Sequence, residues 1–165
     1  MSFKHLIAAG AAMAALAVIP ATAQDFHANP TYTTLTLTTG FAHDPTTVHL
    51  SSGGGIDAAA LNNAAHVGNC SGMVANAPDV RLNFTAGSAL PLIISARSPG
   101  ANDTTLVING PDGQWYCNDD RANGDLNPAI RFEHPTSGQY DIWVGTFGGS
   151  QLLPTDLSVS ELTAP

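Results

Sequence analysis

The feature that most constrains the fold is a series of short stretches in which apolar and polar residues alternate. In residues 80–85, Val80, Leu82 and Phe84 fall on one face and polar side chains on the other. Side chains of a β-strand point alternately to the two faces of a sheet, so this pattern indicates half-buried strands. Other β-prone stretches lie at residues 32–38, 46–50, 90–97, 104–109, 114–117, 130–133, 140–144 and 157–161.

Clusters of Gly, Pro, Asn and Asp separate these stretches. Short strands at such spacing predict an all-β fold, an antiparallel sandwich or barrel of about eight or nine strands with little helix. The sequence Gly-Pro-Asp-Gly at residues 110–113 joins two β-prone stretches and predicts a hairpin. The one helical candidate covers residues 57–67, with Asp57 as its cap and Gly68 at its end.

Residues 1–23 have the pattern of a signal peptide. Lys4 precedes an apolar run from Leu6 to Ile19, and small residues follow up to Ala23. This run is shorter than the roughly 20 residues that a membrane-spanning helix requires. We therefore expect cleavage near Ala23 and a mature chain that is periplasmic or secreted and has no transmembrane segment.

Export bears directly on the two cysteines, Cys70 and Cys117. In an oxidising compartment such a pair usually closes, so we predict a disulfide. The long loop that it closes corresponds to a stabilisation of roughly 4 kcal/mol in the chain-entropy model. Residues 53–76, the least regular part of the chain, then form an excursion held by Cys70. We expect residues 24–44 to be an N-terminal lead-in and residues 45–165 to form the β-sandwich domain.

The charge of the chain narrows the choice of partners. The formal net charge is −8, and the single lysine, Lys4, leaves with the signal peptide. An acidic surface disfavours nucleic acid and anionic lipid as partners. It is compatible with cations, with basic partners, or simply with solubility.

Sequence patterns for catalysis are weak. A hydrolytic serine or cysteine needs a neighbouring base and an oxyanion hole, but the sequence has no Gly-x-Ser-x-Gly elbow, and Ser71 adjoins Cys70. The histidines show neither His-x-His nor His-x-x-x-His spacing, so no zinc site is indicated. Protease activity is therefore not expected. Two alternatives remain: a small secreted hydrolase acting on peptides or glycans through a site not apparent in the sequence, and a structural component of the envelope.

Asn and Asp are concentrated in residues 118–127, immediately after Cys117. Their oxygens suit calcium, a hard cation that takes about six to eight oxygen ligands. The run is not an EF-hand, because counting from Asp119 puts Arg121 at the third position and Ile130 at the twelfth. Asn and Asp also stabilise turns by bonding to the backbone. The residues alone leave open whether the segment is a calcium site or a structured turn; its members are Asn118, Asp119, Asp120, Asn123, Asp125 and Asn127.

Aromatic side chains are a further candidate for a carbohydrate- or peptide-binding face. The candidates are Trp115, Tyr116, Trp143 and Phe147. Alternation places Trp143 on the opposite face from the apolar residues on either side of it. In a two-layer sandwich this side chain is either exposed or covered by the termini or by residues 53–76.

Three motifs together resemble the bacterial pre-peptidase C-terminal domain family. They are DTTLVINGPDGQWYCNDD at residues 103–120, LNPAIRF at 126–132 and SGQYDIWVGTF at 137–147. The likeness is good over residues 79–147 and thinner over 41–78. The matching positions are Asp103, Thr104, Leu106, Pro111, Gly113, Asn118, Asp119, Asp120, Ser137, Gly138, Tyr140, Ile142 and Val144.

This resemblance implies a jelly-roll β-sandwich and an accessory, non-catalytic role. Domains of the family usually follow a secreted hydrolase, and some bind calcium, collagen or polysaccharide. We therefore expect an exported binding domain with a protein or polysaccharide ligand. The calcium ligands that we expect are Asp103, Asn118, Asp119, Asp120 and Asp125. We expect a stand-alone domain with no enzyme attached, which departs from the usual pattern of the family. The cysteine pair is a second departure, because it is not a general feature of the family.

Overall fold

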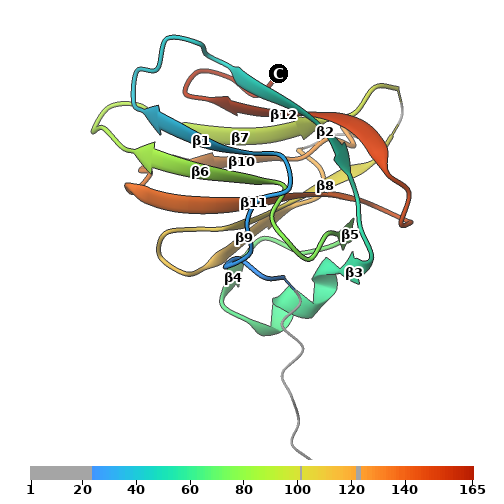
Figure 1. Ribbon diagram of the computed structural model, residues 1–165. Coiled ribbons are helices and arrows are strands. Elements are labelled where there is room, and N and C mark those ends of the chain that lie inside the picture. Colours follow the sequence, from blue (N-terminus) through green and yellow to red (C-terminus); the bar gives the residue numbers. More distant parts are fainter. Residues whose placement is uncertain (1–23, 101, 122–123) are drawn as a thin grey trace, which may run out of the picture.

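In the computed structural model, which describes residues 24–100, 102–121 and 124–165, the chain forms a sandwich of two β-sheets (Figure 1). The larger sheet runs in the order β1 (Thr33–Thr38), β6 (Val80–Thr85), β11 (Gly138–Thr146), β8 (Thr104–Asn109), β9 (Trp115–Asn118) and β4 (His66–Val67). Two further short strands, β3 (Ile56–Asp57) and β5 (Met73–Val74), extend it beside the end of β11. The smaller sheet runs β10 (Ala129–Phe132), β7 (Leu92–Arg97), β12 (Leu153–Ser160) and β2 (Thr46–Ser52).

The chain repeatedly crosses from one sheet to the other. Among the described strands after β6, β8 and β9 are the only consecutive pair that share a sheet, and they form the expected hairpin. Most neighbours are antiparallel, as expected, but β1 runs parallel to β6 and β4 runs parallel to β9. Parallel pairing requires a long connection between the two strands, and in both cases the intervening chain contains several other strands.

The alternating stretches of the sequence become the nine strands of four or more residues. The expected all-β sandwich is therefore confirmed. Some boundaries differ: β11 begins at Gly138 and β12 begins at Leu153, ahead of the alternating residues. The signal peptide expected at residues 1–23 lies outside the described residues, as does Asn123 of the Asx-rich run.

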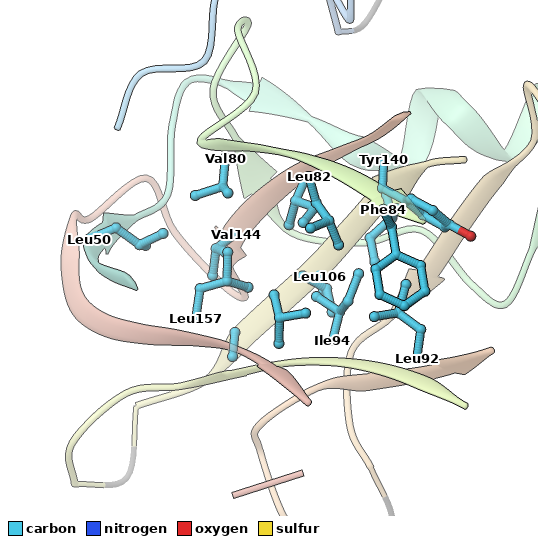
Figure 2. Packing of buried hydrophobic residues seen from close by; sticks show 14 residues of the cluster. Leu50, Val80, Leu82, Phe84, Leu92, Ile94, Leu106, Tyr140, Val144 and Leu157 are labelled. Atoms are coloured by element: carbon cyan, nitrogen blue, oxygen red, sulfur yellow. The ribbon is translucent and has the colours of Figure 1, made fainter. Parts of the chain in front are cut away.

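The main core lies between the two sheets. The alternating residues of β6, which are Val80, Leu82 and Phe84, point inward and are buried. They pack in one cluster with buried side chains of the smaller sheet. Figure 2 shows this cluster, in which the partners from the smaller sheet include Leu92, Ile94 and Leu157.

The helical candidate at residues 57–67 is wrong in type and extent. It is a 3₁₀ helix, η1 (Ala58–Asn63), and Asp57 caps it as expected by accepting the Ala59 N–H at 2.9 Å. The side chain of Asn62 binds the backbone of Cys70 in both directions, each at 2.9 Å, and this helps to fold the following chain back. Among the described residues, no helix is long and apolar enough to cross a membrane.

A second core lies on the outer face of the larger sheet, beneath residues 53–76. Trp143 is fully buried there, and its ring lies 5.4 Å from that of Trp115. The predicted disulfide between Cys70 and Cys117 is confirmed and belongs to this core. It ties the excursion to β9, so Trp143 is covered rather than exposed. In Figure 1 the excursion, with η1, lies along the lower side of the sandwich.

Candidate metal centre

Three carboxylates meet at one end of the β8–β9 hairpin. Asp103 immediately precedes β8, and Asp119 and Asp120 immediately follow β9. The two strands are antiparallel, with Leu106 opposite Asn118, so the start of β8 lies beside the end of β9. One oxygen from each carboxylate lies within 4.8 Å of the others.

Two carboxylate oxygens of this acidic cluster are buried without a hydrogen-bond donor among the described residues. Asp103 and Asp119 are half-buried, whereas Asp120 is exposed. Oδ1 of Asp103 and Oδ1 of Asp119 are both buried, and neither accepts a hydrogen bond within the described part of the chain. A buried oxygen without a donor has lost its hydration and gained no replacement, which is unfavourable. The cluster is therefore short of positive charge.

The pKa values of the cluster point in the same direction. Burial raises the pKa of Asp103, and the negative charges of Asp119 and Asp120 raise it further. Burial also raises the pKa of Asp119. The nearby Ser71 hydroxyl opposes this rise, although it forms no well-aligned hydrogen bond with the carboxylate, whereas the negative charge of Asp120 raises the pKa further. Either a proton or a metal cation would relieve this repulsion.

The other two expected ligands have different partners. Asn118 donates to the backbone carbonyl of Asp120 at 3.0 Å and accepts the Ala129 N–H at 2.9 Å. Asp125 pairs with Arg121 at 2.9 Å and accepts both the backbone and side-chain N–H groups of Asn127. Hydrogen bonding from the Asn127 side chain is the main reason that the pKa of Asp125 is lowered.

The Asx-rich run thus combines the two interpretations that the sequence left open. Asn118 and Asp125 stabilise the turn, while Asp119 and Asp120 join Asp103 in the acidic cluster. The atoms that the cluster offers to a metal are carboxylate oxygens, which suit a hard cation such as Ca²⁺ better than a metal that prefers nitrogen or sulfur. These residues can therefore supply part of a calcium coordination shell.

A loop with an exposed aromatic residue lies beside the cluster. The Phe147 N–H donates to the backbone carbonyl of Asp103 at 3.1 Å, and the Phe147 side chain is 52% exposed. A pocket of about 180 Å³ next to this contact is lined in part by Asp103, Thr146, Phe147 and Gln151. The cluster is thus linked through the backbone to the connection between β11 and β12.

The four aromatic candidates do not share one face. Trp115 and Trp143 belong to the second core, and Tyr116 packs partly against the main core. Only Phe147 of the four is exposed. The sequence could not distinguish these positions, because the cover over Trp143 comes from residues 53–76.

The five histidines of the described chain are all exposed. Nδ1 of His49 lies 2.5 Å from Oδ1 of Asp156, and Nδ1 of His66 lies 2.9 Å from the carbonyl oxygen of Ala64. These contacts pair a ring nitrogen with a carboxylate or a backbone carbonyl, and neither activates a nucleophilic side chain.

No protein-family model matches the chain, and no curated protein matches its sequence. Among solved structures, it is similar to the pre-peptidase C-terminal domain of collagenase from Bacillus anthracis, with 17% identity and a TM-score of 0.43, covering 81% of this chain and 100% of that one. It is also similar to PliG from Aeromonas hydrophila, a periplasmic inhibitor of g-type lysozyme, with 14% identity and a TM-score of 0.36, covering 78% of this chain and 96% of that one. The first is a domain of the family that the sequence motifs resemble.

Proposed function

We propose that this chain is an exported, non-catalytic binding domain whose acidic cluster takes up a calcium ion. The observation that carries the proposal is the meeting of Asp103, Asp119 and Asp120, two of which have a buried carboxylate oxygen without a hydrogen-bond donor. A divalent cation would satisfy these oxygens and cancel the repulsion between the three charges.

Such an ion would act on the loops at one end of the sandwich. It would join the start of β8 to the loop after β9, which begins two residues after Cys117. Through the hydrogen bond between Asp103 and Phe147 it would also steady the loop that joins β11 to β12. A protein or polysaccharide ligand meeting this end of the molecule would then encounter ordered loops, which lowers the entropy that binding costs.

Export is the setting in which this proposal makes physical sense. The disulfide between Cys70 and Cys117 persists in oxidising compartments outside the cytoplasm. Extracellular calcium modules also work at high free calcium, with dissociation constants as weak as about 10⁻³ M. A site built on three carboxylates, completed by water or backbone oxygens, is suited to that range.

Thermal unfolding in calcium and in chelator tests the proposal. Saturating Ca²⁺ at about 100 times its dissociation constant should stabilise the fold by about 2.7 kcal/mol and raise the Tm by roughly 5–10 °C. Magnesium should have a smaller effect, because it demands a tighter octahedral shell. An unchanged Tm in Ca²⁺, together with no ion density in calcium-soaked crystals, would refute calcium binding.

Two Asp→Asn variants from the same loop sharpen this test. Asp119→Asn should abolish the rise in Tm with Ca²⁺, yet in chelator it should be at least as stable as the wild type because repulsion within the cluster is reduced. Asp125→Asn is the matched control: it weakens the contacts with Arg121 and Asn127 and lowers the Tm, but the increment due to Ca²⁺ should remain. If both variants lost the rise in Tm with Ca²⁺, the ion would not be bound by the acidic cluster alone.

A further inference from the structure

A second pocket lies at the opposite end of the β8–β9 hairpin. It encloses about 130 Å³ between the hairpin tip and the loop that joins β10 to β11. The side chains that matter to its chemistry are those of Asp112, Tyr116, Phe132, His134 and Tyr140. Asp103 precedes β8 and Asp112 follows it, so the six residues of β8 separate this pocket from the acidic cluster by roughly 20 Å.

The wall of this pocket is aromatic. The ring of Phe132 lies 4.9 Å from that of Tyr116 and 5.3 Å from that of Tyr140. Each pair is nearly perpendicular, with interplanar angles of 72° and 69°. Aromatic faces carry partial negative charge, so a wall of this kind attracts a cation. The three strands β9, β10 and β11 supply one ring each, which fixes the wall within the sandwich.

The polar groups of the two tyrosines are already engaged. The Tyr140 hydroxyl donates to the carbonyl of Thr136 at 2.8 Å, and the Tyr116 hydroxyl donates to Oδ2 of Asp112 at 2.5 Å. Burial is the main cause that raises the pKa of Tyr116 to about 12, and the hydrogen bond to Asp112 contributes to the rise. The phenol is therefore neutral and acts to orient the carboxylate of Asp112.

Asp112 supplies the negative charge of the pocket. It is exposed at the hairpin tip, where its Oδ1 accepts the Gln114 N–H at 3.1 Å. Among the described residues, no ion pair joins it to a cationic side chain, and Arg131, which adjoins Phe132 in the sequence, pairs with Glu133 at 2.7 Å. Neutral donors thus fix the carboxylate in place, and it has no ion-pair partner within the described part of the chain.

We propose that this pocket binds a small organic cation, an ammonium or guanidinium group on an apolar stem. The cation would lie against the aromatic wall and beside the carboxylate of Asp112, while its apolar atoms cover the rings. An anion is disfavoured by the same carboxylate, and the charge distinguishes this ligand from a neutral apolar group of the same shape. The proposal does not depend on calcium, because the two sites share no residue.

Titration with choline, followed by the amide shifts of ¹⁵N-labelled protein, tests this proposal. Choline should produce saturable shifts confined to residues 112–116 and 132–140. The neutral isostere 3,3-dimethyl-1-butanol should produce none, and N-acetylarginine amide reports whether a guanidinium is accepted as well as, or instead of, a quaternary ammonium. Saturable binding of either cation supports the proposal; no binding of either, or an equal response to the neutral alcohol, overturns it.

Asp112→Asn isolates the role of the charge. The amide keeps an oxygen for the Gln114 N–H, so the hairpin should fold while the affinity for the cation falls at least about fivefold. Asp57→Asn is the matched control, since Asp57 also accepts the N–H two residues on and lies at the other end of β11. Asp57→Asn should bind as the wild type does. Unchanged affinity in Asp112→Asn would overturn the proposal.

Phe132→Leu tests the aromatic wall separately. It removes the central ring but keeps an apolar side chain on β10, so binding should fall below detection while the remaining amide spectrum stays folded. Because Phe132 also packs against the main core, its variant is interpreted only beside Asp112→Asn, which has no such contact. Binding retained in a folded Phe132→Leu variant would contradict the role of the wall.

Discussion

Asp79 is a buried carboxylate whose pKa rises on folding. It is 3% exposed, and its Oδ2 accepts the Val144 N–H at 2.7 Å. Burial raises the pKa of Asp79 from 3.8 to about 7, although the hydrogen bond from Val144 opposes this rise. The folded protein therefore holds a proton on Asp79 over a pH range in which the unfolded chain has lost it.

This difference predicts how stability depends on pH. Because the folded pKa is raised, the contribution of Asp79 to the free energy of unfolding is complete below about pH 4 and is lost as the pH rises to about 7. Asp79→Asn keeps an oxygen for the Val144 N–H but carries no charge. We expect the free energy of unfolding of the variant to exceed that of the wild type by up to about 4 kcal/mol at pH 8, and by much less at pH 5.

Denaturant unfolding of both proteins at the two pH values measures this. Burial also raises the pKa values of Asp103 and Asp119, so the wild type alone would mix several titrations. The difference between wild type and Asp79→Asn cancels those shared contributions. The same difference at pH 5 and pH 8 would mean that Asp79 does not titrate between them.

At the scale of single residues, the sequence indicated the kind of side chain at the candidate site but not which residues form the acidic cluster. It identified a segment rich in oxygen donors, and the family motif added Asp103. It could not separate Asp119 from Asp125, because the two side chains are identical and differ only in their neighbours. Those neighbours include Arg121 and Asn127 for Asp125, and Asp103 for Asp119, which the hairpin brings in from a distance.

Among the elements, the excursion of residues 53–76 is where sequence patterns are least informative. The two-residue strands β3, β4 and β5 are too short to show alternation. Alternation along β11 did place Trp143 on the outer face, but only the disulfide suggested what covers it. Just after β4 the backbone also comes very close to β9: a Cβ on Gly68 would lie 2.0 Å from the carbonyl oxygen of Cys117, so only glycine fits there.

Removing the disulfide tests whether the excursion needs this attachment. A Cys70→Ala/Cys117→Ala double variant should lose about 4 kcal/mol of stability, less any strain that the bridge holds in the folded state. The cover over Trp115 and Trp143 should loosen, so we expect a red shift in tryptophan emission and stronger acrylamide quenching under native conditions. Wild-type protein kept in reductant is the control and should behave alike. Unchanged stability and quenching would show that packing alone holds the excursion.

At the scale of the whole molecule, much of the N-terminal lead-in is built into the sandwich. β1 pairs with β6 along its full length, and Leu35 and Leu37 pack against the main core. Glu161 accepts the Thr39 hydroxyl at 2.5 Å and the Gly40 N–H at 2.6 Å, which joins this segment to the end of the chain.

The largely buried side chain of Arg81 fixes the start of the same segment. Its guanidinium forms an ion pair with Asp141 at 2.7 Å and donates to the carbonyls of Phe26 and Ala28 at 2.8 and 3.0 Å. Alternation predicted the two layers because inward- and outward-facing residues are local information. It could not predict which strands are neighbours, because pairs such as β1 with β6 join residues far apart in the sequence.

Truncation distinguishes a built-in strand from a dispensable lead-in. A chain beginning at residue 39 lacks β1, which leaves the N–H and C=O groups of β6 unpaired along one edge and uncovers part of the core. We expect it to aggregate or to melt at least about 10 °C below a chain beginning at residue 24. A chain beginning at residue 31 keeps β1. It loses the carbonyls of Phe26 and Ala28 that bind Arg81, the hydrogen bond from Asp25 to Asn76 and the contact of Phe26 with Trp115, but no strand, so its Tm should fall less. If the chain that starts at residue 39 matched the longest one, the main-chain pairing of β1 with β6 would contribute nothing to stability, and residues 24–38 would be a true lead-in.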